Sequence, residues 1–455
     1  MLRSIAVRYL ACLVLLSAVG VAALSPAACT IRDARDLQFF TGRHYWELSF
    51  DSLSAAAGVG LLSKNLVEQY APRGQWTLWG IGIAGALLML ATMAALVRRL
   101  QPFGEHTAPS LRSILLAWMA WQATLFGGLH AAAIAFCPTV HWSESLWLVG
   151  NALNGVGLAP TALDAGTAMT AAIIGMLGGL GWLLWLLPVA WMRGLRGLPW
   201  SRFAFAAIGY VALLAALSVC VATFESPRGE SRIVADDPAI AAQPTTVRVT
   251  RSATQIVCAA TAGLPTEPLG ETGLRDASKA TLAIAVIIGG MLGSPMGGLQ
   301  WWVFALAIAA VIRARAHDET PRVSELRRAA LRCFVAITAF VIVIAIGFLL
   351  IESIVATRFQ RPATFADALL DAASATCGAN LSSGLTASLI SRNLVRGLNM
   401  PFDMFYLGLV WTMLAMLVGK VLPIWILASA ASRATAPQTS DPAKANAPAG
   451  SIHTT

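Results

Sequence analysis

Eight apolar stretches, separated by charged or Pro- and Gly-rich loops, follow one another along the chain. About 20 apolar residues in a helix cross a hydrocarbon core of roughly 30 Å, so the pattern predicts an all-α membrane protein. The sixth stretch is too long for one straight span, and its middle is rich in glycine, which is tolerated at membrane depth where the backbone lines a cavity. The stretches lie near 5–24, 77–97, 113–136, 168–192, 203–224, 279–312, 333–352 and 402–431.

Between two spans, a helical run of small residues leads four times into a glycine-bearing turn that ends in leucine. The four segments are 54–61, 151–158, 258–264 and 374–381. Four units of span, pore loop and span predict a single chain around one pseudo-fourfold central pore. The tail over 433–455 lacks the apolar content to fold alone and is expected to be disordered in the cytoplasm. The predicted units are 1–100, 101–200, 201–320 and 321–432.

These turns have the chemistry of an ion filter. A cation that leaves water must exchange its hydration shell for other oxygens, and a ring of backbone carbonyls supplies them. Glycine adopts the necessary dihedral angles at little cost, and a short helix that ends at the turn points its negative end at the pore. The predicted ion-binding filter is Ala57, Gly58, Val59, Gly60, Asn154, Gly155, Val156, Gly157, Thr261, Ala262, Gly263, Cys377, Gly378, Ala379 and Asn380.

Gly60, Gly157, Gly263 and Asn380 occupy equivalent positions in the four turns. Asparagine is one of the few other residues that tolerate the left-handed region, so it is a permissible substitute for glycine here. The alternative is that the small residues only let the spans pack closely. The recurrence of the pattern at four matching places favours the filter.

Composition and charge fit a membrane protein. With 57% hydrophobic and 12% charged residues, the chain is not a soluble globular protein. Because basic residues in short loops set the orientation, both termini are expected in the cytoplasm, in a bacterial-type inner membrane. The formal net charge of +9 then reflects topology and contact with anionic lipid; no nucleic-acid partner is expected, since no basic stretch is interleaved with aromatic residues. The inside loops hold Arg98, Arg99, Arg112, Arg193, Arg196, Arg202, Arg313, Arg315, Arg322, Arg327, Arg328 and Arg332.

The first apolar stretch has a second interpretation, a cleaved signal peptide, because Arg3 and Arg8 precede the apolar run. Ala28 and Cys29 resemble a lipoprotein cleavage site, but Pro26 stands where such a site wants leucine. We interpret the stretch as a span, because its removal would leave seven spans and break the first unit.

The seven cysteines form no CxxC pair, so neither a zinc site nor a disulfide framework is predicted. One bridge, between Cys29 and Cys137 near the outer surface, is left open. The chain contains no GxxxxGK(S/T), and no GxGxxG follows a strand pattern. It therefore carries no nucleotide-binding domain of its own, and no cofactor is expected.

Four motifs carry a family resemblance. Residues 255–264, QIVCAATAGL, resemble a third pore loop of the type QVVSARTAGF, and residues 289–300, GGMLGSPMGGLQ, resemble GGSPGSTGGGIK. Residues 178–182, GGLGW, resemble GGLGF, and residues 419–423, GKVLP, resemble GRLExxP. On these motifs, in register over roughly residues 45–430, the chain resembles the Trk/Ktr/HKT superfamily of potassium-uptake proteins, and its eight spans resemble the shorter Ktr-type subunits.

The resemblance implies uptake of K+, a homodimer, and a cytoplasmic ring of nucleotide-binding regulatory subunits as partner. It also implies that the glycine-rich break in the sixth span is an intramembrane loop that gates the pore; the alternative is a simple kink in an overlong helix. Lys420, deep in the last span, is a positive plug beside the permeation path or a side chain that snorkels to the inner surface. The predicted gate residues are Gly289, Gly290, Gly293, Ser294, Gly297, Gly298 and Lys420.

The chain departs from the family pattern at places that bear on selectivity. Asn380 stands where the family has glycine, the first turn lacks the usual hydroxyl residues, and Gln300 replaces a lysine. These departures put the preference for K+ over Na+ in question and leave the fold assignment unchanged. Asp51 and Asp367, each before a pore-helix run, either draw cations into the outer mouth or cap their helices, which we favour.

The leading hypothesis is passive or ion-coupled uptake of a monovalent cation, with K+ expected, through a carbonyl-lined filter gated by an intramembrane loop. The first alternative is a divergent channel of the same fold that conducts Na+ or selects weakly. The second is a membrane-embedded metal enzyme, because His130 and His141 lie near Glu144; no HExxH or comparable spacing occurs, and we expect no enzyme. The basic loops at 193–202 and 313–332 either dock a regulatory subunit or only hold the orientation and bind anionic lipid.

Overall fold

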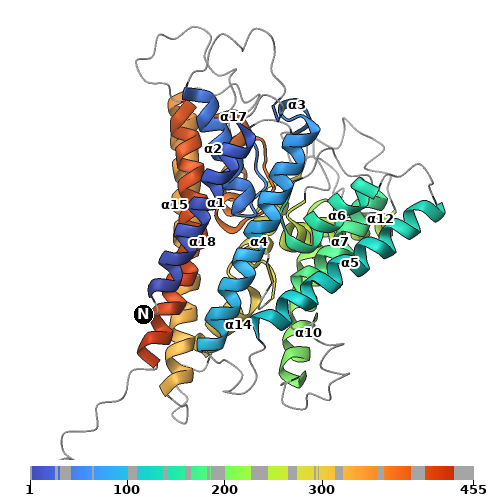
Figure 1. Ribbon diagram of the computed structural model, residues 1–455. Helices are drawn as coiled ribbons and strands as arrows, with labels where there is room; N and C mark the ends of the chain where they lie inside the picture. Colours follow the sequence, from blue (N-terminus) through green and yellow to red (C-terminus); the bar gives the residue numbers. More distant parts are fainter. Residues whose placement is uncertain are drawn as a thin grey trace, which may run out of the picture.

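The chain folds into a bundle of helices, seen in the computed structural model (Figure 1). Within the described residues the chain forms no strand, and its one β-bridge joins Thr30 and Tyr70. The prediction of an all-α membrane protein is confirmed. The structure describes residues 3–25, 29–30, 42–63, 66–100, 110–136, 142–158, 165–181, 185, 200–226, 244–264, 274–291, 294–295, 297–312, 321–355, 363–390 and 405–434.

The helices occur in four successive groups, each with a long helix, a short helix that ends at a glycine turn, and a further helix. This order is consistent with the four predicted units, whose boundaries remain predictions. The groups are α1 (Arg3–Leu24), α2 (Gly42–Ala56), α3 (Leu66–Gln69) and α4 (Pro72–Leu100); α5 (Leu111–Phe136), α6 (Trp142–Asn154) and α7 (Ala165–Gly179); α10 (Trp200–Phe224), α12 (Thr245–Val257), the π-helical turn η2 (Cys258–Ala262), α13 (Asp276–Ile288) and α14 (Trp301–Ile312); and α15 (Pro321–Val355), α16 (Phe365–Cys377), α17 (Leu385–Ile390) and α18 (Phe405–Ala434).

Six of the described helices are long and apolar enough to cross a membrane. The two other predicted spans have a different form. The fourth, near 168–192, begins with the shorter apolar helix α7 and is described only up to residue 181 and at Trp185. The sixth, near 279–312, is broken into α13 and α14. The six long spans are Ile5–Leu24, Pro72–Arg98, Leu111–Ala132, Ala204–Phe224, Val323–Ser353 and Tyr406–Ala430.

The break in the sixth span has a clear backbone origin. Gly289 ends α13 with φ of 65° and ψ of −153°, and Gln300, just before α14, has φ of 66°. Neither conformation continues an α-helix, and the described residues between them are not helical. The alternative of a simple kink is therefore wrong, because a kink keeps its two helical halves joined.

The four groups close into a ring around the short helices. α4 packs against α6, and α6 and α7 pack against η2. α13 packs against α16, and α14 against α15, before α18 returns to α1 and α2. The C-terminal ends of α6 and α16 and the whole of η2 are buried at the centre. The turns that follow them therefore lie inside the ring.

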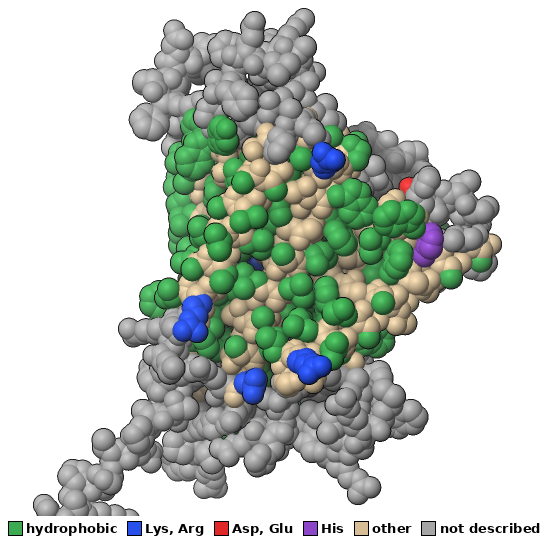
Figure 2. All heavy atoms as spheres, in the orientation of Figure 1, with side chains coloured by type: hydrophobic (Ala, Val, Ile, Leu, Met, Phe, Trp, Pro, Cys, Tyr) green, Lys and Arg blue, Asp and Glu red, His purple; other side chains and the backbone are tan. Residues whose placement is uncertain are grey.

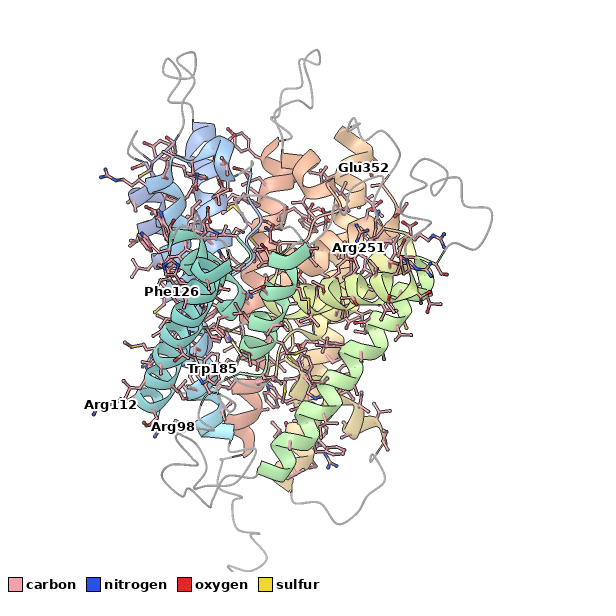
Figure 3. All side chains as sticks on the ribbon, turned by 90° about the vertical axis from the view of Figure 1, so that its right-hand side faces the viewer. Arg98, Arg112, Phe126, Trp185, Arg251 and Glu352 are labelled. Atoms are coloured by element: carbon pink, nitrogen blue, oxygen red, sulfur yellow. The ribbon has the colours of Figure 1, made fainter. Side chains whose placement is uncertain are left out.

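The outer helices present apolar side chains. Most of the apolar segment of each outer helix is not buried inside the molecule: the buried share is 22% in α1, 11% in α5 and 22% in α10. Figure 2 shows hydrophobic side chains spread over one face. A surface of this kind suits contact with lipid. Arg98 and Arg112 lie at one end of the molecule, and Arg251 and Glu352 at the other (Figure 3).

Candidate cation filter and gate loop

Each of the four short helices ends at a glycine in the left-handed region. The angle φ is 62°, 61°, 61° and 86° at Gly58, Gly155, Gly263 and Gly378. Gly60 and Gly157, each two residues further on, both have φ of 75°. Glycine adopts such angles without a Cβ penalty, so the four turns form where the sequence permits them.

Asn380 does not follow this pattern. Gln300 is the one non-glycine residue with positive φ in the described part of the chain, so Asn380 is not left-handed. The sequence argument that asparagine fits here because it tolerates the left-handed region is wrong. The fourth turn instead takes a different backbone path from the turns at Gly60 and Gly157.

The turns meet one another through backbone atoms. A Cβ added at Gly60 would lie 2.6 Å from the carbonyl carbon of Gly157 and 2.8 Å from the carbonyl oxygens of Val156 and Gly157. A Cβ added at Gly157 would lie 3.1 Å from the carbonyl oxygens of Gly263 and Val59. Carbonyl groups from the first three turns are thus gathered at one place, as a carbonyl filter requires.

Two polar side chains of the predicted filter, Asn154 and Thr261, form hydrogen bonds within their own units. Asn154 accepts a hydrogen bond from the Trp118 indole at 2.7 Å and donates to the Gly150 carbonyl at 2.8 Å. The Thr261 hydroxyl donates to the Val257 carbonyl at 2.6 Å. The buried apolar residues Ala57, Val59, Val156, Ala262 and Ala379 can offer an ion only backbone oxygens.

Asp51 holds the segment that leaves the first turn. It lies inside α2, is 0% exposed, and accepts hydrogen bonds from the Ser63 amide at 2.6 Å, the Ser63 hydroxyl at 2.9 Å and the Tyr70 hydroxyl at 2.7 Å. The capping interpretation of Asp51 is wrong, because the residue lies inside α2 and not at its start; the attraction of cations to the outer mouth stays a prediction. Asp51 braces the filter from behind.

Asp371 does the same in the fourth unit, and the sequence analysis missed it. It is 0% exposed and accepts from the Ser383 amide at 2.6 Å and from the amide and hydroxyl of Thr386 at 2.7 Å. The pattern D-x-x-S-A-x-x-G-x-x-L-x-S, present at residues 51–63 and 371–383, is the signal that could have identified both aspartates.

Asp367 caps α16 and also joins two units. It forms a capping box with Thr364, which confirms the favoured interpretation. Its carboxylate pairs with the Lys279 amine at 2.5 Å, and the two side chains are 1% and 0% exposed. The pair links α13 to α16, so the partner of Lys279 comes from the following unit. A lysine inside an apolar stretch is costly without such a partner. The position of Lys279 in the sixth apolar stretch could therefore have predicted a buried acidic partner.

The glycine-rich loop between α13 and α14 lies against the inner side of the turns. The Met291 amide donates to the Gly179 carbonyl of the second unit at 2.6 Å, and the Gly298 amide donates to the Cys377 carbonyl of the fourth at 2.7 Å. A Cβ added at Gly297 would collide with that same Cys377 carbonyl. The loop is thus fixed to the second and fourth units, and it must be glycine-rich to approach so closely. Of the other predicted gate residues, Gly289, Gly290 and Ser294 lie in this loop, and Gly293 lies outside the described residues.

Lys420 reaches the same carbonyl from α18. Its side chain is buried, with 4% of the residue exposed, and its amine donates to the Cys377 carbonyl at 3.3 Å. The snorkelling alternative is therefore wrong. A Cβ added at Gly378 would lie 2.9 Å from the Gly58 carbonyl oxygen and would collide with the Lys420 amine, so this amine lies directly against the fourth glycine turn.

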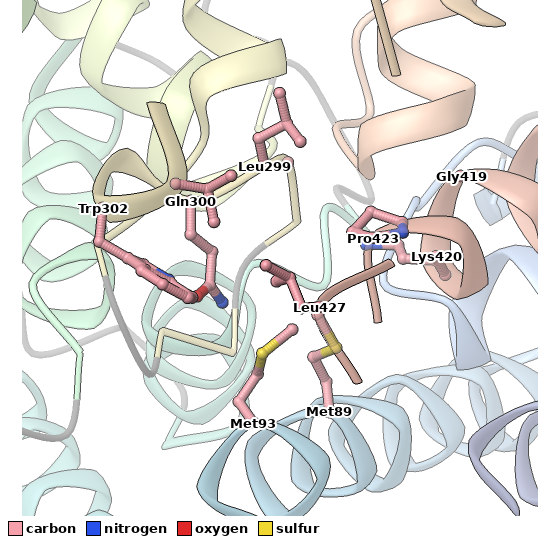
Figure 4. Close-up of a pocket in the computed structure, with 11 residues that line it drawn as sticks. Met89, Met93, Leu299, Gln300, Trp302, Gly419, Lys420, Pro423 and Leu427 are labelled. Carbon is pink, nitrogen blue, oxygen red and sulfur yellow. The ribbon is translucent and has the colours of Figure 1, made fainter. Parts of the chain in front are cut away.

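A largely apolar pocket lies beside Lys420, below the gate loop (Figure 4). Met89 and Met93 of α4 face Gln300 across it. The amide oxygen of Gln300 accepts from the Trp302 indole at 2.9 Å. Gln300, which departs from the family lysine, thus forms part of the wall of this pocket.

Residues 204–422 match the family model described as TrkH, cation transport protein. The predicted resemblance to the Trk/Ktr/HKT superfamily is confirmed. The solved structure of the potassium transporter TrkH from Vibrio parahaemolyticus has a similar fold, with a TM-score of 0.63 over 92% of this chain and 83% of that chain at 14% sequence identity. No curated protein matches the sequence.

The Trk-type match also decides between transport and catalysis. The family model describes a cation transporter, so the chain is a transporter and the enzyme alternative is set aside. His130 stacks on Phe126, Glu144 lies in the first turn of α6, and His141 falls outside the described residues. Within the described residues, no group of three His, Cys, Asp or Glu side chains could hold a metal ion.

Proposed function

We propose that this Trk-type transporter takes up a monovalent cation, with K+ as the expected ion, through a filter of backbone carbonyls gated by the loop between α13 and α14. The supporting observation is the convergence of the glycine turns: backbone carbonyls of Val59, Val156, Gly157 and Gly263 crowd at one place inside the ring. Such carbonyls replace the hydration shell of a cation. No bond is made or broken in the reaction, and no cofactor is needed.

The gate acts at the carbonyl of Cys377. The Gly298 amide and the Lys420 amine both donate to this oxygen, and both donors occupy the place that a cation leaving the filter would need. Transport then requires the loop and Lys420 to move away from the inner end of the filter. The buried positive charge also repels cations there, since water does not screen it.

The test is rubidium uptake into proteoliposomes that contain the purified protein, with and without a metal chelator, together with complementation of a potassium-uptake-deficient cell at low external K+. Uptake that is saturable and insensitive to chelator supports the proposal. Failure of both assays, with insertion of the protein in the membrane verified, would overturn it.

A weakly selective or Na+-conducting transporter is the second candidate, and Asn380 favours it. An amide side chain at the ring changes one quarter of the coordinating groups, and amide donors do not bind cations. The measurement is the reversal potential under bi-ionic K+/Na+ conditions. A value near zero assigns the weakly selective transporter, and a strongly K+-selective value removes this candidate.

We further propose a multi-pass protein of a bacterial-type inner membrane, with both termini in the cytoplasm, that forms a homodimer and docks on a cytoplasmic nucleotide-binding subunit. The support is the resemblance to the family and the basic segment at the start of α15, where Arg328 is 61% exposed and shares Glu325 with Arg332. Arg313, Arg315 and the loop at 193–199 lie outside the described residues.

Neutralising Arg327 and Arg328 together tests the docking. Insertion should remain unchanged, because other arginines hold the orientation. Co-purification of a soluble ATP- or NAD-binding partner should weaken. Docking would be overturned if the purified chain transports fully without nucleotide and no such partner is retained from native membranes. The protein would then be a constitutively open pore.

A further inference from the structure

The fourth turn presents hydrogen-bond donors at the place where the other turns present carbonyl oxygens. The side-chain amide of Asn380 donates to the Gly157 carbonyl of the second unit at 2.6 Å. The backbone amide of Asn380 donates to the Gly263 carbonyl of the third unit at 2.9 Å. One residue of the fourth turn therefore binds a glycine carbonyl of the second turn and a glycine carbonyl of the third.

The side chain of Asn380 lies across the centre of the ring of units. The units are arranged in chain order around the centre, since α4 packs against α6, the second unit against η2, and α13 against α16. The second and fourth units are therefore opposite one another. A side chain of the fourth unit that reaches Gly157 of the second lies across the path between them, where a dehydrated cation would sit.

The carbonyls of the fourth turn are also turned to internal partners. Ser374 donates its hydroxyl to the Ala379 carbonyl and accepts the Leu381 amide at 3.0 Å. The backbone carbonyl of Cys377 accepts hydrogen bonds from the Gly298 amide and the Lys420 amine. Two carbonyls of the fourth turn, those of Ala379 and Cys377, are thus engaged by donors of the protein.

The first turn gives a direct comparison within the same molecule. Ser54 is the equivalent of Ser374 in the shared D-x-x-S-A-x-x-G pattern, and its buried hydroxyl has no hydrogen-bond partner among the described residues. It leaves the Val59 carbonyl near Gly157. A serine at this position therefore does not by itself bind the carbonyl five residues later. Ser374 binds the Ala379 carbonyl only in the turn that contains Asn380.

We propose that the fourth turn closes the filter from within, with the Asn380 amide as a built-in occupant of the ion site. Conduction requires Asn380 to release Gly157 and Gly263, so that their carbonyls turn to the cation. This inference rests on the proposed function, because it concerns the regulation of the same filter.

Two variants remove the closure in different ways. Asn380→Gly deletes the side chain and places glycine at this position, as at Gly60 and Gly157 in the first two turns. Asn380→Asp keeps the size and exchanges the amide donor for a carboxylate, which the Gly157 carbonyl repels and a cation attracts. Gln122→Ala, which truncates a partly buried amide on α5 away from the filter, is the matched control.

The experiment is rubidium uptake into proteoliposomes of wild type and these three variants at equal protein density. Both Asn380 variants should take up rubidium at least tenfold faster than wild type, and Gln122→Ala should equal wild type. In detergent, added K+ should raise the thermal midpoint of Asn380→Gly more than that of wild type, because a ligand stabilises the state that binds it.

The outcomes separate this inference from the proposed function. Equal uptake and equal K+ stabilisation for wild type and both Asn380 variants would overturn the closure and leave cation transport in place. No uptake and no K+ effect in any folded sample would overturn both. If Asn380→Gly does not fold, the Asp variant carries the same test, because it preserves the volume of the side chain.

Discussion

Replacing Gly60 with alanine should stop transport, because the filter has no room for a single added carbon. The new Cβ would lie 2.6 Å from the carbonyl carbon of Gly157 and 2.8 Å from the carbonyl oxygens of Gly157 and Val156. All three are backbone atoms, so no flexible side chain can move aside. The φ of 75° at Gly60 adds a left-handed penalty of about 1–2 kcal/mol for a residue with a Cβ.

Overpacking of a well-packed region costs about 1–3 kcal/mol, so the total destabilisation is about 2–5 kcal/mol. Unfolding entropy is about 2.1 cal/mol/K per residue near 60 °C. For the 455 residues of this chain, the thermal midpoint should fall by about 2–5 °C. Most of the protein would stay folded at 25 °C, and the displaced Gly157 carbonyl would reduce rubidium uptake by at least about tenfold, since a shift of this kind acts on the oxygens that replace the hydration shell.

Gly80→Ala is the matched control. Gly80 lies inside α4, and a Cβ added there meets no heavy atom within 4 Å. The same substitution should stabilise the helix by about 0.5–1 kcal/mol and leave uptake unchanged. Rubidium uptake and thermal unfolding are measured for both variants. Wild-type uptake by Gly60→Ala would refute the assignment of this turn to the filter.

Three further changes test the supports of the filter and its gate. Lys279→Met removes the buried counter-charge of Asp367, which keeps its hydrogen bonds to Thr364, and should destabilise the protein by about 3–5 kcal/mol, seen as a lower thermal midpoint in detergent; an unchanged midpoint would show that the pair does not hold α13 to α16. Asp371→Asn turns an acceptor into a donor that faces the amide and hydroxyl of Thr386 and should cost about 1–3 kcal/mol, together with a loss of uptake that a merely peripheral residue would not produce. Lys420→Met keeps the length and removes the charge at the inner end of the filter, so it should raise rubidium uptake several-fold, whereas Lys420→Arg should not; equal rates for both would exclude the charge as a barrier.

The local features of this chain could be predicted from its sequence. The long apolar runs identify the spans because burial of about 20 apolar residues in lipid is a property of consecutive residues. The turns at Gly58, Gly155 and Gly378 form as predicted because the left-handed angle depends on the glycine itself. The break that begins at Gly289 was visible for the same reason. Asp367 caps α16 because Thr364 precedes it by three residues.

The tertiary structure alone decided which groups meet at the centre of the ring. Asn380 contacts Gly157, which is 223 residues away, and no local rule relates the two. Lys420 points to the Cys377 carbonyl instead of the membrane surface, and Asp51 braces a segment instead of capping a helix. In each case nearby residues predict the helix or turn in which the residue lies. Its hydrogen-bond partner depends on how one unit packs against another, or on how the chain after the turn packs against the preceding helix. A buried polar group must find such a partner to avoid the cost of leaving water, and the sequence does not say which of several distant partners the packing will supply.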